Sequence, residues 1–177
     1  DVRRGNDCRS LWRILIMTEP YSLTVARSDS GYVVFLEGRA TMKEGPAFCT
    51  FVKELLDHAE EPKLVVCVEG CDYMDSTFLG GLIALHKKYS LQSPPRFIVS
   101  ASRESRARLL ASARLDLILK LIDDVPECTG RRAPIPTPPA DAREFTQHAI
   151  KCHRLLAEIG GRQPPVFQLV ADQLSKE

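Results

Sequence analysis

A short, uninterrupted apolar run near the middle of the chain constrains its fold most strongly. The run Leu64–Val68 is bounded by Pro62 and Gly70, a pattern typical of a β-strand that is covered on both faces. Strands of that kind lie in the interior of parallel sheets, between layers of helix. The run therefore predicts a strand in the middle of a sheet within an α/β domain.

The segments around this strand alternate between strand and helix patterns. Turn residues Ser28–Gly31 separate two β-branched and aromatic runs, which predicts a β-hairpin. Spacings of three and four residues between apolar positions predict amphipathic helices. The remaining elements are a helix from Pro46 to about Glu60, a helix from about Thr77 to before Pro94, a strand at Phe97–Ser100, a helix at Arg103–Ala113 with Ser102 as its N-cap, and a last strand at Leu117–Ile122.

This order of elements predicts the fold class. Strands that alternate with helices are joined by right-handed crossovers, so residues 18–125 are expected to form an α/β domain with a mixed, mainly parallel β-sheet. The opening hairpin is expected at one edge of that sheet. One alternative stays open at the end of the domain, where Leu115–Ile122 also fits a continued helix.

The two ends of the chain are interpreted as extensions of this domain. Residues 1–17 form an N-terminal extension, and residues 1–16 are expected to lie upstream of the natural start, because the patterned sequence begins after Met17. The rival interpretation is an amphipathic anchor, but its apolar part is too short to hold a helix in water. Five prolines between Pro126 and Pro139 predict that residues 126–140 are a stiff, extended linker without another element.

Residues 141–177 carry the pattern of a C-terminal helical hairpin. Gly160-Gly161 would end its first helix, and Pro164-Pro165 opens a shorter segment. Two helices cannot bury an apolar seam alone, so the hairpin is expected to dock on the α/β domain or on another chain, and a homodimer through these helices is one prediction. The seam consists of Phe145, Ala149, Cys152, Leu156 and Ile159.

The most informative stretch follows the central strand. Asp75-Ser76-Thr77 opens the second helix, and these residue types satisfy free N–H groups at a helix start. Gly80 and Gly81 then stand inside the helix, where each costs about 1 kcal/mol relative to alanine. Such a cost predicts that another backbone or a partner surface lies close to them.

This stretch resembles the STAS domain family of bacterial anti-sigma factor antagonists and sulfate transporter tails, over about residues 21–124. Family members show a glycine after the second strand, matched by Gly38, and an Asp-Ser-Ser/Thr-Gly-Leu-Gly loop, matched from Asp75 to Gly80. The six cysteines include no C-x-x-C pair, which indicates reduced thiols and a cytoplasmic setting. The resemblance implies a non-enzymatic bacterial phosphoprotein that regulates transcription by binding an anti-sigma factor that is also a serine kinase. It implies that the kinase phosphorylates Ser76. The implied partner-binding residues are Asp75, Ser76, Thr77, Phe78, Leu79, Gly80 and Gly81.

The sequence departs from the family pattern at three positions. Phe78 replaces the usual glycine, and Thr41 and Cys67 replace frequent aspartates. A bulky ring beside Ser76 is expected to reshape the partner surface or to limit access of a kinase. The alternative function is therefore a constitutive STAS scaffold or transport-accessory module without a phosphate cycle, with Phe78 as a fixed hydrophobic anchor. A third class, a small-ligand binder or unrecognised enzyme, would need a pocket with convergent polar groups.

Other chemistries lack their patterns. No G-x-S-x-G motif and no phosphate-binding glycine loop occurs, so no catalytic residue and no cofactor are expected. No nucleic acid or membrane partner is expected, because the net charge is +1 and the apolar runs are short. Three other groups could carry a function, but each is better explained as core or surface residues, so no metal is expected. The possible metal ligands are His148, Cys152 and His153, and the possible redox pair is Cys67 and Cys71. The possible docking patch consists of Arg103, Arg106, Arg108 and Arg114.

Overall fold

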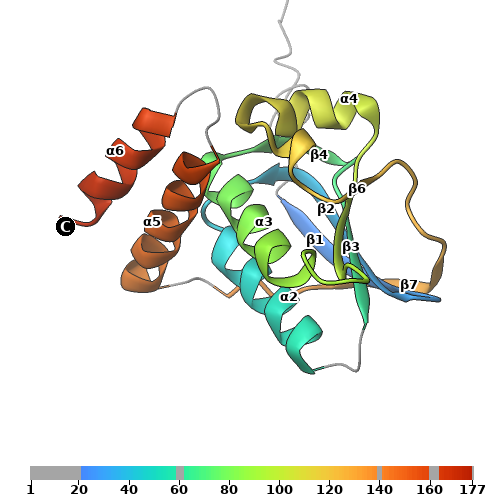
Figure 1. The fold of residues 1–177 in the computed structure, drawn as a ribbon. Helices are drawn as coiled ribbons and strands as arrows, with labels where there is room; N and C mark the ends of the chain where they lie inside the picture. The colour runs from blue at the N-terminus through green and yellow to red at the C-terminus, as the bar shows by residue number, and fades with distance from the viewer. Residues whose placement is uncertain (1–20, 59–61, 139–140, 160–163, 177) are drawn as a thin grey trace, which may run out of the picture.

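A computed structural model of the chain describes residues 21–58, 62–138, 141–159 and 164–176. Within these ranges seven strands form one mixed sheet and five helices accompany it, which confirms the predicted α/β class (Figure 1). The predicted N-terminal extension, residues 1–17, lies outside the described residues. The strands are β1 (Ser22–Ser28), β2 (Gly31–Ala40), β3 (Lys63–Cys67), β4 (Cys71–Met74), β5 (Phe97–Ser100), β6 (Leu121–Ile122) and β7 (Cys128–Pro134).

The sheet is mainly parallel, as predicted. Its strand order is β6-β5-β3-β2-β1-β7, and β4 pairs with the far end of β2. The pairings β2–β3, β3–β5, β5–β6 and β2–β4 are parallel, and only β1–β2 and β1–β7 are antiparallel. The apolar run predicted as a central strand forms β3, which has a neighbour on each side.

Two glycines shape strand β2. Gly31 closes the turn after β1, where a side chain would collide with the backbone of Lys63. Gly38 has φ +75°, in the left-handed region that favours glycine. At Gly38 the strand leaves β3 and pairs with β4, and its N–H donates to the carbonyl of Gly70 at 2.8 Å. Gly38 therefore turns the strand so that β4 reaches the start of the next helix.

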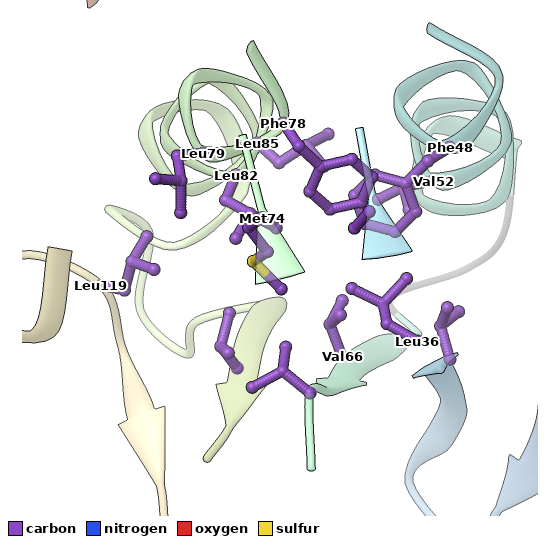
Figure 2. Close-up of a cluster of buried hydrophobic side chains, with 14 of the residues drawn as sticks. Leu36, Phe48, Val52, Val66, Met74, Phe78, Leu79, Leu82, Leu85 and Leu119 are labelled. Carbon is purple, nitrogen blue, oxygen red and sulfur yellow. The ribbon is translucent and has the colours of Figure 1, made fainter. Parts of the chain in front are cut away.

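Two helices cover one face of the sheet and enclose the main core. These are α2 (Gly45–His58) and α3 (Ser76–Tyr89), which lie together over the sheet in Figure 1. Figure 2 shows Phe48 of α2 and Phe78 of α3 facing each other above Leu36 and Val66 of the sheet. The spacing of apolar residues predicted both helices. The apolar residues that recur on one face of each helix are the ones buried in this core.

The segment after β5 differs from its prediction. Ser102 caps a helix as expected, since its hydroxyl accepts from the N–H of Ser105. The regular α-helix α4, however, spans only Arg103–Ser105 and continues as a π-helix over Arg106–Leu110 and a 3-10 turn. The last strand, β6, is Leu121–Ile122. Residues Leu115–Leu117 form a second 3-10 turn that buries Leu115, so the predicted strand starts four residues later.

Residues 126–140 were predicted as a linker without another element, and the structure corrects this. Residues Cys128–Pro134 form β7, which pairs antiparallel with β1. The opening hairpin was expected at this edge of the sheet, but β7 is the edge strand. None of the five prolines lies within residues 127–133. The N–H groups of this run are therefore free to bond to the open edge of β1. After the strand, Ile135 is buried in the main core.

The C-terminal hairpin docks on the α/β domain, which was one of its two predicted positions. Helix α5 (Ala142–Glu158) packs against α3, and α6 (Pro164–Leu174) packs against α5 (Figure 1). The predicted seam is the buried face of α5, where Ala149, Cys152 and Leu156 are at most 2% exposed. Among the described helices, none has the length and apolar character that a membrane span requires.

Candidate functional site

The start of α3 is held by Asp75, which is its N-cap. The carboxylate accepts from the N–H of Phe78 at 2.9 Å, as predicted for a cap, and from the N–H of Met42 at 2.6 Å. One carboxylate therefore stabilises the first turn of α3 and ties it to the turn before α2. Both oxygens of Asp75 have a structural role, and Asp75 and Ser76 are half-buried.

The hydroxyl of Ser76 is bonded to a histidine of the C-terminal hairpin. Ser76 Oγ lies 2.9 Å from Nε2 of His153, and Nδ1 of the same ring lies 2.9 Å from the carbonyl of Ala149. A carbonyl oxygen only accepts, so Nδ1 donates; in the neutral imidazole Nε2 then accepts, and the Ser76 hydroxyl donates to it. The predicted phosphorylation site is thus engaged within the chain.

Gly80 explains how α5 comes so close to α3. A Cβ atom added to Gly80 would lie 2.5 Å from Cβ and 2.6 Å from Cα of Cys152. Real Cβ atoms do not approach other atoms this closely, so only glycine lets the two helices pack at this distance. The predicted close approach of another backbone is confirmed, and the backbone is that of the chain's own helix.

Gly81 faces a second cluster, between α2, α3 and α5. A Cβ there would meet Cys49 Sγ at 2.9 Å and the ring of His148 at 3.9 Å. The Sγ atom of Cys152 lies 3.5 Å from Nε2 of His148. Burial raises the pKa of Cys49 to about 11 and that of Cys152 to about 12, so both thiols are protonated at neutral pH and pack as small apolar groups.

His148 gives this cluster a pH dependence. Burial, and then the nearby charges of Lys53 and Lys151, lower the pKa of His148 from 6.5 to about 4. Between these two pH values the unfolded chain binds a proton that the folded chain does not, so stability is complete above pH 6.5 and falls as the pH drops toward 4. Burial lowers the pKa of His86 as well, in the same direction.

We therefore expect a His148→Gln variant to lose less stability than the wild type between pH 7.5 and 4.5. One proton accounts for a slope of at most about 1.4 kcal/mol per pH unit. Urea denaturation at several pH values measures the difference, and His58→Gln, at an exposed position at the end of α2, is the matched control. Parallel curves for the wild type and His148→Gln would contradict a lowered pKa of the half-buried His148.

The residues predicted to bind a partner are mostly inside the folded chain. Thr77, Phe78 and Leu79 are 3%, 1% and 5% exposed, and Gly80 and Gly81 are buried as well. The Phe78 ring stacks on Phe48, with centroids 5.0 Å apart and planes at 24°. Phe78 was predicted to contact a partner; the structure corrects this, because the ring is part of the core.

A cavity of about 330 Å³ lies beside Ser76. Phe167 of α6 forms part of its wall, and the Phe167 ring lies 6.2 Å from the ring of His153. Both helices of the hairpin therefore border the site. The cavity is lined by Tyr73, Met74, Asp75, Ser76, Leu79, Ser112, Ala113 and Phe167.

The other candidate groups have structural surroundings. Burial raises the pKa of Cys67 and of Cys71, so neither thiol is activated as a nucleophile. Arg106 pairs with Asp123 at 2.6 Å, and Arg108 donates to the carbonyl of Cys71 at 3.0 Å. Among the residues that the structure describes, no group of three or more His, Cys, Asp or Glu side chains is arranged to hold a metal ion.

No sequence pattern predicted the position of His153 beside Ser76. His148 and His153 flank the predicted seam of α5, one on each edge. The spacing is enough to predict that both histidines lie at the border of the docked face of α5. It does not predict that His153 contacts Ser76. A scan of the chain against models of known protein families finds no match.

Proposed function

We propose that this chain is a STAS-like, non-enzymatic protein-binding module that acts as an anti-sigma factor antagonist. Its partner is an anti-sigma factor with serine kinase activity, and Ser76 is the residue that the kinase phosphorylates. The observation that supports this most is the place of Ser76, the first residue of α3, half-buried at the border of a surface cavity. The five cysteines that the structure describes have free thiols, which suits a reducing compartment, and we place the protein in the cytoplasm.

A phosphate on Ser76 would act through its charge. It would add about −1.5 to −2 charges beside Asp75. The free N–H groups and the dipole of the α3 N-terminus offset part of that charge within the chain, so the domain keeps its fold. A partner surface that fits a neutral hydroxyl would have to desolvate the dianion, and the complex would dissociate.

We expect Ser76→Asp to weaken binding of the anti-sigma factor at least tenfold while the melting temperature changes little. Each candidate anti-sigma factor kinase is incubated with ATP and the full chain, and mass spectrometry locates the phosphate. Isothermal titration calorimetry then compares the wild type, Ser76→Asp and Ser76→Ala. Phosphate on another residue, or equal affinity of Ser76→Asp and the wild type, would overturn the switch.

One observation favours the alternative function, a constitutive scaffold or transport-accessory module. The Ser76 hydroxyl already donates to the buried His153, so it is engaged within the chain. Phe78 is buried in the core, so such a module would bind without Phe78 as its anchor. In that case no kinase modifies Ser76, and Ser76→Asp binds its partner as the wild type does. The same calorimetric comparison therefore separates the two functions.

A further inference from the structure

We propose that α5 occupies, within the chain, a helix-docking face of α3, and that a helix of the partner replaces it there. The docking face consists of Ser76, Gly80 and Lys87, which lie on one stripe of α3 because they are four and seven residues apart. The identity of the partner rests on the function proposed above. In the folded chain α5 runs beside α3 (Figure 1), and it contacts each of these three residues.

Three contacts along the stripe define what the face accepts. His153 bonds to Ser76, the backbone of Cys152 lies against Gly80, and Glu158 pairs with Lys87 at 2.7 Å. At its centre the face has no side chain, so a helix backbone can approach it directly. An occupant therefore needs a small residue over Gly80, a polar group toward Ser76 and an acidic group toward Lys87. We infer that the partner binds through an amphipathic helix with this pattern.

The helix that now occupies the face adds Leu156 to the main core, and Leu155, Ile159 and Phe167 of the hairpin are partly buried against that core. Leu156 is the only large aliphatic residue of α5 that is fully buried among the described residues. The rings and aliphatic side chains of the main core come chiefly from α2, α3 and the sheet. Beyond α5, helix α6 leaves Val166 and Leu169 exposed. The α/β domain can therefore keep its core when the hairpin moves aside.

The test weakens the packing of α5 on α3 by a substitution in α5, and then measures whether a free peptide with the α5 sequence binds to the exposed face of α3. The probe is a fluorescein-labelled peptide of residues 141–159, and the protein is the full chain with Cys152→Glu, which puts a charge against Gly80. Fluorescence anisotropy is expected to show at least tenfold tighter binding of the peptide to this variant than to the wild type. Adding Gly80→Ala to the variant is expected to abolish binding, because the added methyl group fills the centre of the face.

Each result of this test decides the proposal. Failure of the peptide to bind a folded Cys152→Glu chain, or equal binding when Gly80→Ala is added, would overturn it. Loss of the near-ultraviolet circular dichroism signal in Cys152→Glu would overturn it too, because α5 would then be an essential part of the core. Glu158→Lys is a milder opening that leaves the core intact; it should also increase peptide binding, and Lys87→Glu in the same chain should reverse the effect.

A kinase assay on the same variants separates this inference from the proposed function. If the peptide binds and no kinase modifies Ser76 in either chain, the docking face stands and the proposed function fails. If Ser76 is phosphorylated at equal rates in the wild type and the opened variant and the peptide does not bind, the function stands and the inference fails. If both hold, phosphorylation of the opened variant is at least several-fold faster.

Discussion

Replacing Phe78 by alanine is expected to lower the free energy of unfolding by about 3–5 kcal/mol. The ring is 1% exposed, stacks on Phe48 and has Tyr21 edge-on with centroids 6.4 Å apart. Its removal would leave a cavity between α2, α3 and the sheet, which neighbours fixed on three elements can fill only in part. Urea denaturation followed by circular dichroism measures the loss.

Two variants control this experiment. Phe78→Leu keeps most of the buried volume, so its loss should be clearly smaller. Phe167→Ala removes the same ring from α6, where the residue is only half-buried, and should affect the hairpin more than the domain. An ordinary surface substitution changes the free energy of unfolding by at most about 0.5 kcal/mol. A change this small for Phe78→Ala would contradict the buried position of the ring.

The position of Phe78 changes how the two proposed functions can be compared. If Phe78 were a surface anchor, Phe78→Gly would weaken partner binding in a folded chain. Because the ring is in the core, Phe78→Gly is expected to unfold much of the domain, and lost binding would then say nothing about an anchor. Ser76→Asp is the informative variant, since Ser76 is half-buried at the surface.

Replacing Gly80 by alanine is expected to release α5 while the α/β domain stays folded. The new Cβ would lie within 2.6 Å of Cys152 backbone atoms, so α5 must move, at a cost of about 1–3 kcal/mol for overpacking. Helix α3 itself gains about 1 kcal/mol from the same change. Hydrogen exchange of the α5 amides should therefore become about 5- to 150-fold faster, with little change in β3.

Gly81→Ala is the matched control for this prediction. It makes the same substitution one residue later, but its Cβ meets Cys49 Sγ of α2 at 2.9 Å and the ring of His148 only at 3.9 Å. The α5 backbone is not in its way, so α5 should stay protected from exchange. Equal exchange of α5 in Gly80→Ala and the wild type would contradict the close packing of the two helices.

Most elements of the α/β domain could be predicted, because their signals are local. The turn at Ser28–Gly31 and the continuous apolar run of β3 each depend on a few neighbouring residues. The spacing that places Phe78 with Leu82 and Leu85 on one face of α3 also predicted that this face is buried. That spacing conflicted with the expectation that Phe78 binds a partner, and burial decided the outcome.

The predictions that differed depended on neighbours distant in sequence. Residues 128–134 carry no strong strand signal and are all exposed; they form β7 because β1 offers an unpaired edge. Residues 106–117 have the apolar spacing of a helix, yet packing turns them into π and 3-10 segments with Arg114 at φ 58°. Backbone pairing and packing of this kind cannot be read from local spacing.

The α/β class, the cap at Asp75 and the need for a close neighbour of Gly80 follow from the residues alone. These follow from periodicity, capping chemistry and the cost of glycine in a helix, which act over a few residues. The identity of that neighbour, α5, and the contact of His153 with Ser76 from 77 positions away depend on the packing of the whole chain. Contacts over such separations depend on how whole helices pack, which no local pattern specifies.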